Sequence, residues 1–283
     1  MAEIVKLCCG SAEVHVALQG AHVVYWKAQN GQEVIYTSPT AIFSEGVAIR
    51  GGVPICWPQF SDMGPGKVHG YARNNKWMLD KKDEGQESSA AVFALPPEVH
   101  PPEWAGFGVT FLVRLGSNKL ELELAVANGQ PASAEPKTFT GALHTYFAVP
   151  EIANTTIEGG LDATQYLDNL QERAKQPAAP IRSIDKEVDR IYLGVKDPVV
   201  IRHPGSDRRG AFTVTIASQG FPDIVLWNPW IEKAQRLKDL PDEGYHHFVC
   251  VESAVIAKPV VLQPGSSWTG VQSITVATTS SSL

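Results

Sequence analysis

The sequence predicts an all-β fold of antiparallel sheets, a sandwich or a barrel with few short helices. Apolar and polar residues alternate over many short runs, which is the period of a half-buried strand. Turn-forming pairs such as Gln19-Gly20, Asn30-Gly31 and Asn128-Gly129 separate these runs. Large all-β folds often exceed ~200 residues as one unit. We therefore expect residues 1–283 to form a single domain.

The clearest strand is Leu120–Val126, in which every second residue is Leu or Val and the residues between are mostly glutamate. The same reasoning predicts further strands along the whole chain. In order they are Val14–Leu18, Ala21–Lys27, Glu33–Thr37, Phe107–Leu115, Thr138–Val149, Thr155–Glu158, Val199–Arg202, Phe212–Ile216, Ile224–Trp227, His247–Ala257 and Thr269–Ala277.

A helix is expected at only one place, Ile231–Leu240, where Lys and Glu are frequent and Pro241 ends the run. The stretch Leu170–Pro180, rich in Gln, Ala and Pro, is expected to be a surface loop. Thr278–Leu283 is expected to be a frayed tail.

The charge balance bears on possible partners. The chain has 24 Lys and Arg against 30 Asp and Glu, a formal net charge of -6, with no basic block. This argues against nucleic acid or an anionic membrane surface as partner. No apolar run approaches the ~20 residues of a membrane span, and the first residues do not resemble a secretory signal. The four cysteines, Cys8, Cys9, Cys56 and Cys250, lack CxxC spacing and fit reduced thiols in the cytoplasm.

Three segments place polar residues where a simple strand pattern would not. They are Arg50–Phe60, His69–Asn74 and Thr138–Phe147, and the third is an apolar strand interrupted by His144. In the first segment, two glycines follow the arginine and allow the backbone to approach a ligand closely. Further candidate segments are Asp189–Tyr192, Trp227–Trp230 and Val249–Ser253.

Glu252 is unusual because nearly all its neighbours in Phe248–Ala254 are apolar. Burying a carboxylate costs several kcal/mol unless it is paired or hydrogen-bonded. The alternative is that Glu252 faces solvent on an alternating strand. His144 has a comparable alternative, a core histidine with satisfied hydrogen bonds.

The other candidates also have structural alternatives. Arg50 and Arg73 could form surface ion pairs, and Trp227 and Trp230 fit core aromatics better than sugar platforms. The adjacent histidines at 246 and 247 diverge in an extended segment, so we expect no metal site there. No dinucleotide or Walker fingerprint is present, and we expect the protein to use no cofactor.

Taken together, these segments resemble the aldose 1-epimerase (galactose mutarotase-like) superfamily, and most closely its branch of glucose-6-phosphate 1-epimerases, or hexose-6-phosphate mutarotases. The matching stretches are Ile49–Pro54, His69–Asn74, Leu143–Phe147, Asp189–Tyr192 and Val251–Ser253, so that the resemblance covers most of the chain. It implies a β-supersandwich. It also implies cofactor-independent interconversion of the α and β anomers of a hexose 6-phosphate, with glucose 6-phosphate the expected substrate.

The resemblance implies roles for individual residues. His144 would be the general acid and Glu252 the general base, which together move the two protons that ring opening requires. The implied substrate-binding residues are Arg50, Arg73 and Asp189, with His69 and Gln59 as weaker candidates. Arginine suits a phosphate dianion because its forked donors match the phosphate oxygens. Members of this branch often carry glutamine before the His-Gly pair, where this chain has Val68.

Three other functions remain open from the residues. One is a non-catalytic carbohydrate-binding protein on the same fold. Another is a glycoside hydrolase, for which Asp189 or Asp223 would supply the second carboxylate. The third is an aldose 1-epimerase acting on free hexoses. We expect a small phosphosugar as the only partner, no nucleic acid or membrane, and a monomer.

Overall fold

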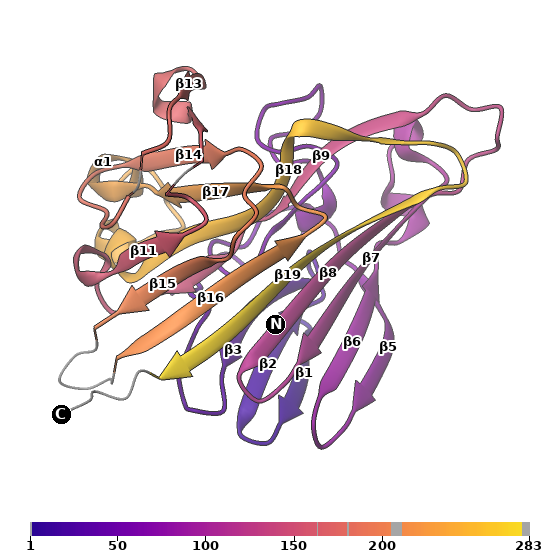
Figure 1. The fold of residues 1–283 in the computed structure, drawn as a ribbon. Coiled ribbons are helices and arrows are strands. Elements are labelled where there is room, and N and C mark those ends of the chain that lie inside the picture. Colours follow the sequence, from indigo (N-terminus) through magenta and orange to yellow (C-terminus); the bar gives the residue numbers. More distant parts are fainter. Residues whose placement is uncertain (1, 163, 180, 205–210, 279–283) are drawn as a thin grey trace.

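Two large antiparallel sheets and one small sheet make up the protein, which is seen here in a computed structural model (Figure 1). The structure describes residues 2–162, 164–179, 181–204 and 211–278. The small sheet consists of β1 (Ile4–Cys9), β2 (Ala12–Ala17) and β3 (His22–Lys27). The all-β architecture predicted from the alternating pattern is confirmed.

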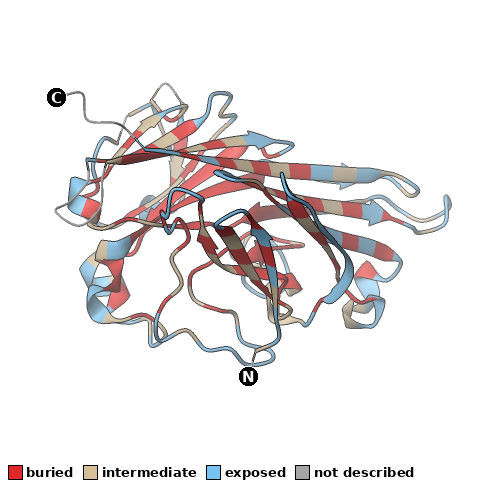
Figure 2. Ribbon diagram, turned by 90° about the horizontal axis from the view of Figure 1, so that it is seen from below, coloured by how far each residue is buried: buried red, intermediate tan, exposed pale blue. Residues whose placement is uncertain are grey.

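The first large sheet, called the β8 sheet here, has eight strands. In spatial order they are β11 (Thr156–Gly159), β15 (Val199–His203), β16 (Phe212–Gln219), β19 (Ser267–Thr278), β8 (Lys119–Asn128), β7 (Phe107–Leu115), β6 (Ser89–Ala94) and β5 (Met78–Glu84). The residues of β8 alternate as the sequence predicts, because Leu120, Leu122 and Leu124 are fully buried between more exposed neighbours. Figure 2 shows such alternation along the strands.

The second large sheet, called the β18 sheet, carries the residues of interest. In spatial order its strands are β13 (Ala174–Gln176), β12 (Tyr166–Asp168), β14 (Val188–Tyr192), β17 (Asp223–Asn228), β18 (Phe248–Leu262), β9 (Lys137–Leu143) and β4 (Ile55–Cys56), and β10 (Tyr146–Ala148) also pairs with β18. The first nine residues of β18 are all buried. A strand covered on both faces has a nearly continuous apolar sequence, so its polar members need partners inside the protein.

Helices are few and short. The one α-helix is α1 (Trp230–Ala234) among the described residues, and six 3-10 helices accompany it: η1 (Ala72–Asn74), η2 (Pro97–Val99), η3 (Pro102–Trp104), η4 (Ile152–Asn154), η5 (Asn169–Gln171) and η6 (Asp242–His247). The helix expected over Ile231–Leu240 is therefore wrong in its length, since α1 ends at Ala234 and a turn begins at Gln235. Within the described ranges, no helix has the length and apolar character needed to cross a membrane.

Four further expectations differ in detail. Glu33–Thr37 is not a strand but a segment of isolated bridges, for example Ile35 with Phe147. Thr138–Val149 is not continuous, because it breaks after Leu143 and resumes at Tyr146. The expected loop Leu170–Pro180 contains the short strand β13, while Pro180 lies outside the described residues. Of the expected tail, Thr278 ends β19 and the remaining residues lie outside the described ranges.

Candidate active site

A pocket of about 380 Å³ lies on one face of the β18 sheet. Antiparallel pairing puts Asp189 of β14 opposite Trp227 of β17, and Val225 of β17 opposite Glu252 of β18. Residues two apart on a strand share a face, so Val225 and Trp227 carry the two carboxylates onto the same side. All four residues line the pocket.

His144 enters this pocket from the break between β9 and β10. Its backbone N–H donates to the carbonyl of Pro54 (3.0 Å), outside the regular ladder. The next residue, Thr145, donates from Oγ1 to Oε1 of the fully buried Gln272 on β19 (2.6 Å). The imidazole stacks on the ring of Tyr146, with centroids 5.0 Å apart, and meets the Trp227 ring edge-on at 5.8 Å. The strand break thus aims one side chain into the pocket and fixes its plane.

His144 and Glu252 meet at the floor of the pocket. Nδ1 of His144 lies 3.3 Å from Oε1 of Glu252. The carboxylate is 1% exposed and the histidine 8%. Nδ1 of His144 and the other carboxylate oxygen, Oε2, are both buried without a hydrogen-bond partner among the described residues, so the 3.3 Å approach is a close contact and not a hydrogen bond. Glu252 is therefore buried rather than facing solvent.

Burial disfavours charge on both members of this pair. It raises the pKa of Glu252 well above its ordinary value, and the negative charge of Asp189 acts in the same direction while Arg73 opposes it. It lowers the pKa of His144 well below its ordinary value, helped by His69, Arg73 and Arg50. Perturbed titratable groups in a pocket are typical of catalytic sites.

The loop that precedes η1 contributes His69 to the lining of the pocket, and η1 itself contributes Arg73. The backbone N–H of Ser61 donates to Nδ1 of His69 (3.2 Å), which leaves Nε2 to carry the ring hydrogen. Burial, reinforced by Arg73 and Arg50, lowers the pKa of His69 to about 3, so the ring is neutral near pH 7. Arg73 donates from Nη2 to the carbonyl of Val68 (3.2 Å), and no other hydrogen bond of its guanidinium is recorded among the described residues.

Arg50 also lines the pocket. Its Nε donates to Oδ1 of Asp239 and its Nη1 to the hydroxyl of Tyr146, both at 3.1 Å. Burial alone would lower the pKa of Arg50, but Tyr146 and Asp239 outweigh it and raise the pKa. Arg50 is thus a fixed, charged group and not a mobile surface ion pair.

Asp189 belongs to a small polar network that lines the pocket. Oδ1 of Asp189 accepts from Nδ2 of Asn169 (2.6 Å), and Oδ2 lies 3.6 Å from Nζ of Lys233. Burial raises the pKa of Asp189, whereas Asn169 and Lys233 oppose that rise. Oδ1 of Asn169 is buried and has no partner among the residues described. Asn169 and Lys233 line the pocket but were not candidates from the sequence.

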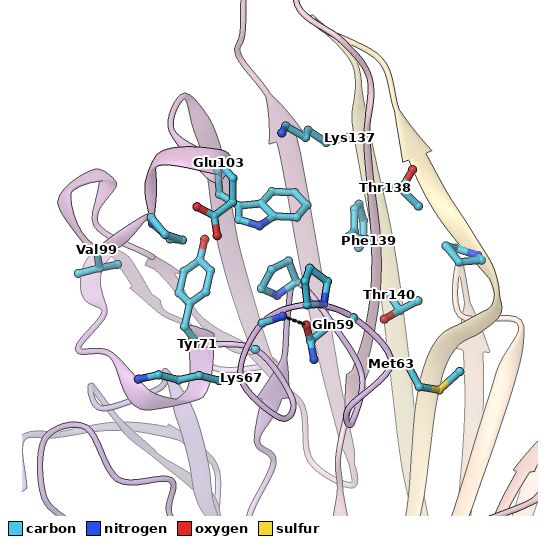
Figure 3. Close-up of a pocket in the computed structure, with 18 of the residues that line it drawn as sticks. Gln59, Met63, Lys67, Tyr71, Val99, Glu103, Lys137, Thr138, Phe139 and Thr140 are labelled. Carbon is cyan, nitrogen blue, oxygen red and sulfur yellow. Dashed lines mark hydrogen bonds between the residues drawn. The ribbon is translucent and has the colours of Figure 1, made fainter. Parts of the chain in front are cut away.

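Gln59 lies outside this pocket. It lines a larger pocket of about 720 Å³ on the far side of the same loop, with Tyr71, Trp104 and Phe139 (Figure 3). Its Nε2 donates to the carbonyl of Ser61 (3.0 Å) and its Oε1 accepts from the N–H of Gly66 (2.7 Å), so the side chain holds the loop together. The larger pocket has aromatic walls but no close acid–base pair, and the smaller one is the better candidate.

Two further candidates have structural partners. Oδ2 of Asp223 accepts from the N–H groups of Ile256 and Ala257 (2.9 and 2.8 Å) at the irregularity of β18, and Asp223 does not line the 380 Å³ pocket. Nδ1 of His246 contacts Glu151 at 2.9 Å. In the described part of the chain no group of three or more His, Cys, Asp or Glu residues has a metal-binding arrangement.

Comparison with known proteins gives a consistent result. The aldose 1-epimerase family matches residues 3–275. A protein of Cenchrus ciliaris named "Putative glucose-6-phosphate 1-epimerase" is 37% identical over 93% of this chain and 80% of its own length. An Escherichia coli protein of the same name is 34% identical over 84% of this chain and 78% of its own. The crystal structure of a "putative mutarotase" from Salmonella typhimurium superposes with a TM-score of 0.87 at 29% identity, covering 98% of this chain and 91% of that one.

Proposed function

Because this chain belongs to the aldose 1-epimerase family, whose isomerases interconvert the anomers of sugars, we propose that its substrate is a hexose 6-phosphate, with glucose 6-phosphate preferred. The observation that carries the proposal is the shared pocket. One buried acid–base pair, His144 and Glu252, lies in it together with two arginines, Arg50 and Arg73. The names of the relatives from Cenchrus ciliaris and Escherichia coli support the same substrate.

Interconversion of anomers needs two proton transfers at neighbouring oxygens. A base removes the proton of the C1 hydroxyl while an acid protonates the ring oxygen, and the bond between C1 and the ring oxygen breaks. Rotation about C1–C2 turns the other face of the aldehyde toward that oxygen, and closure reverses both transfers. Glu252 would act on the C1 hydroxyl and His144 on the ring oxygen. A positioned acid or base contributes typically ~10²–10⁴-fold.

The charge distribution of the pocket suits a phosphosugar. In a pyranose ring the ring oxygen is bonded to C5, and C5 carries C6, whose oxygen bears the phosphate. The proposed acid, His144, and the phosphate site should therefore be neighbours. Arg50 and Arg73 both act electrostatically on His144. Asp189 acts on Glu252, and Arg73 acts on it in the opposite direction. The Asp189 carboxylate lines the pocket and can accept from a sugar hydroxyl. The two guanidinium groups would bind the phosphate through forked donors.

The test is the rate of α-to-β interconversion of glucose 6-phosphate by exchange NMR, with the spontaneous rate subtracted. His144→Ala and Glu252→Gln should each lower kcat by about 10²–10⁴-fold. His15→Gln on β2 and Glu123→Gln on β8, which do not line the pocket, serve as matched controls. Near wild-type rates in both pocket variants would refute the assignment.

A second measurement tests whether Arg73 binds the phosphate group of the substrate. Arg73→Ala should raise KM for glucose 6-phosphate about tenfold or more, because a charge-assisted hydrogen bond contributes about 1.5–3 kcal/mol. The fold should stay intact, since the recorded hydrogen bond of that guanidinium is to a local carbonyl. An unchanged KM with unchanged kcat would remove the phosphate role while leaving anomer interconversion in place.

A further inference from the structure

Tyr146 is a buried side chain that contacts residues of the pocket without lining the pocket itself. It ends a row of paired residues across four strands of the β18 sheet. Asp189 of β14 pairs with Trp227 of β17. Trp227 in turn pairs with Cys250 of β18, and Cys250 pairs with Tyr146 of β10. Directly paired residues share one face of a sheet. Tyr146 therefore lies on the face that carries the pocket, although it is only 2% exposed.

The ring of Tyr146 supports the ring of His144. The two rings are stacked, with centroids 5.0 Å apart and planes inclined by 11°. The Tyr146 ring is itself held by Trp227, edge-on at 5.9 Å, and by Phe248 at 5.0 Å. Nδ1 of His144 is buried without a hydrogen-bond partner among the described residues. The plane of the imidazole therefore depends on ring contacts, namely this stack and the edge-on contacts with Trp227 and His69.

The hydroxyl of the same side chain holds Arg50. It accepts from Nη1 of Arg50 at 3.1 Å, and Nε of Arg50 donates to Oδ1 of Asp239 at 3.1 Å. These two hydrogen bonds fix the guanidinium at two of its three nitrogens. An arginine has five N–H groups, and no further partner of this guanidinium is recorded in the described part of the chain. Nη2 and the second N–H of Nη1 can therefore bind an anion as a fork.

One side chain thus contacts both the proposed acid and one of the proposed phosphate-binding arginines. Two χ angles set the position of a tyrosine ring, and here packing holds the ring while Arg50 holds the hydroxyl. Neither the imidazole nor the guanidinium can move far without displacing Tyr146. Such positions matter for rate, because a displacement of ~1 Å can cost ~10²-fold.

We propose that Tyr146 is a positioning residue that sets the acid and the phosphate site relative to each other: its ring acts on kcat through His144, and its hydroxyl acts on KM through Arg50. In a hexose 6-phosphate, C5 and C6 join the ring oxygen to the phosphate and limit their separation. A fixed spacing between imidazole and guanidinium suits a phosphate at that place. The inference rests on the proposed function, since it takes Arg50 as a ligand of the substrate's phosphate.

Tyr146→Phe tests the hydroxyl, because it keeps the ring and removes only the oxygen. In exchange NMR with glucose 6-phosphate, KM should rise about tenfold, since Arg50 loses one of its two fixed points, while kcat stays close to that of wild type. Tyr245→Phe is the matched control. Tyr245 is buried in the same apolar cluster as Tyr146 but does not line the pocket, so both kinetic constants should stay unchanged.

A double-mutant cycle separates positioning from a general structural effect. Arg50→Ala should raise KM by itself. Tyr146→Phe added to Arg50→Ala should then raise KM no further, because the hydroxyl acts through the guanidinium that is already gone. If the hydroxyl were merely structural, it would change KM by the same factor in both backgrounds, and that result would contradict the proposal.

Tyr146→Leu tests the ring. Leucine fills the site with apolar atoms but cannot stack, so kcat should fall about tenfold or more relative to Tyr146→Phe, in which the stack is restored. Far-UV circular dichroism and urea denaturation check that each variant is folded. If leucine unfolds the protein, Tyr146→Met replaces it, because methionine adapts to irregular gaps in a core.

The outcomes distinguish this inference from the function on which it rests. An unchanged KM in Tyr146→Phe would overturn the inference, as would equal kcat values in Tyr146→Phe and the ring-less variant. In either case acceleration of glucose 6-phosphate exchange by the wild-type protein would leave the proposed function standing. No acceleration by the wild-type protein would remove the proposed function and the inference together.

Discussion

Asn169 lines the pocket beside Asp189, and this position suggests a functional role that could not be inferred from an asparagine in the sequence. Its Nδ2 donates to Oδ1 of Asp189 at 2.6 Å, and this bond opposes the rise in the pKa of Asp189 that burial causes. We expect Asn169→Ala to raise KM for glucose 6-phosphate about tenfold with a smaller effect on kcat, because a hydrogen bond to a charged group contributes about 1.5–3 kcal/mol.

The pH dependence of kcat/KM distinguishes this functional role of Asn169 from a purely structural one. Without Asn169 the pKa of Asp189 should rise further, so kcat/KM should begin to fall at a higher pH as the solution is acidified. Gln171→Ala, which removes a neighbouring hydrogen bond to Asp168, is the matched control and should leave the profile in place. Unchanged KM and an unchanged acid limb in Asn169→Ala would exclude the role.

Residue chemistry explains which site residues the sequence could predict. Glu252 is recognisable because a carboxylate inside an apolar strand is costly, and His144 because it interrupts another such strand. Asn169 gives no such signal, since asparagine is common in turns and here it begins η5. Lys233 lies on a short helix among other charged residues. Only the tertiary structure brings these two residues to Asp189, since η5 packs against β14 and Lys233 extends its side chain to Asp189 from α1.

At the scale of elements, the turn that carries Arg50 depends on Gly52. This glycine has φ of 65°, and a Cβ added to it would lie 2.3 Å from Nε2 of His22 and 2.4 Å from the carbonyl oxygen of Val23, both on β3. We expect Gly52→Ala to destabilise the protein by about 2 kcal/mol or more, because both the backbone conformation and the contact are unfavourable. It should also raise KM, because Arg50 would shift.

Gly31→Ala provides the control for this prediction. Gly31 has φ of 84°, yet a Cβ there would meet nothing within 4 Å. It should therefore show only the backbone cost of about 1–2 kcal/mol, with KM unchanged. Urea denaturation at pH 7.5 and steady-state kinetics measure both effects. Equal loss of stability in the two variants would mean that the contact with His22 is not important.

The strand pattern predicts elements well where one face is buried and poorly elsewhere. β8 and β16 alternate clearly and lie at the expected positions. β5 (Met78–Glu84) is exposed along its whole length and rich in charged residues, so its sequence lacks the alternation of apolar and polar residues that predicts a strand. β13 has three residues and lies at a sheet edge. Such elements form because a neighbouring strand offers hydrogen bonds, which the local sequence does not encode.

For the whole molecule, the pocket combines residues from positions 50 to 252, and the order of strands in the β18 sheet decides which of them meet. Individual segments indicated the candidates, but not that β14, β17 and β18 would be adjacent. Gln59 illustrates the difference, since its segment contributes Phe60 and Ser61 to the pocket while its own side chain lies on the other side of the loop.

The two large sheets are joined beneath the site by a buried polar network centred on Gln272 of β19. Its Oε1 accepts from Oγ1 of Thr145 (2.6 Å), and its Nε2 donates to Oγ of Ser253 (2.8 Å), the neighbours of His144 and Glu252 in the chain. Leucine at position 272 would remove this partner from both hydroxyls. Oγ of Ser253 would keep its hydrogen bond with Oγ of Ser218 (2.7 Å), whereas Oγ1 of Thr145 would keep only a long one to the carbonyl of Leu143 (3.4 Å). The cost should be about 1–3 kcal/mol for each group left unsatisfied.

Gln272→Leu should therefore lower the free energy of unfolding by about 1–3 kcal/mol, mainly because the Thr145 hydroxyl loses its short hydrogen bond. It should also lower kcat for anomer interconversion more than it changes KM, because Thr145 no longer fixes the strand break that aims His144 at Glu252. Thr145→Val, which removes only one hydrogen bond of the network, should give a smaller loss of stability with a comparable fall in kcat. Urea denaturation and exchange NMR on both variants check this. Loss of stability without any fall in kcat would show that the network joins the sheets but does not position the acid.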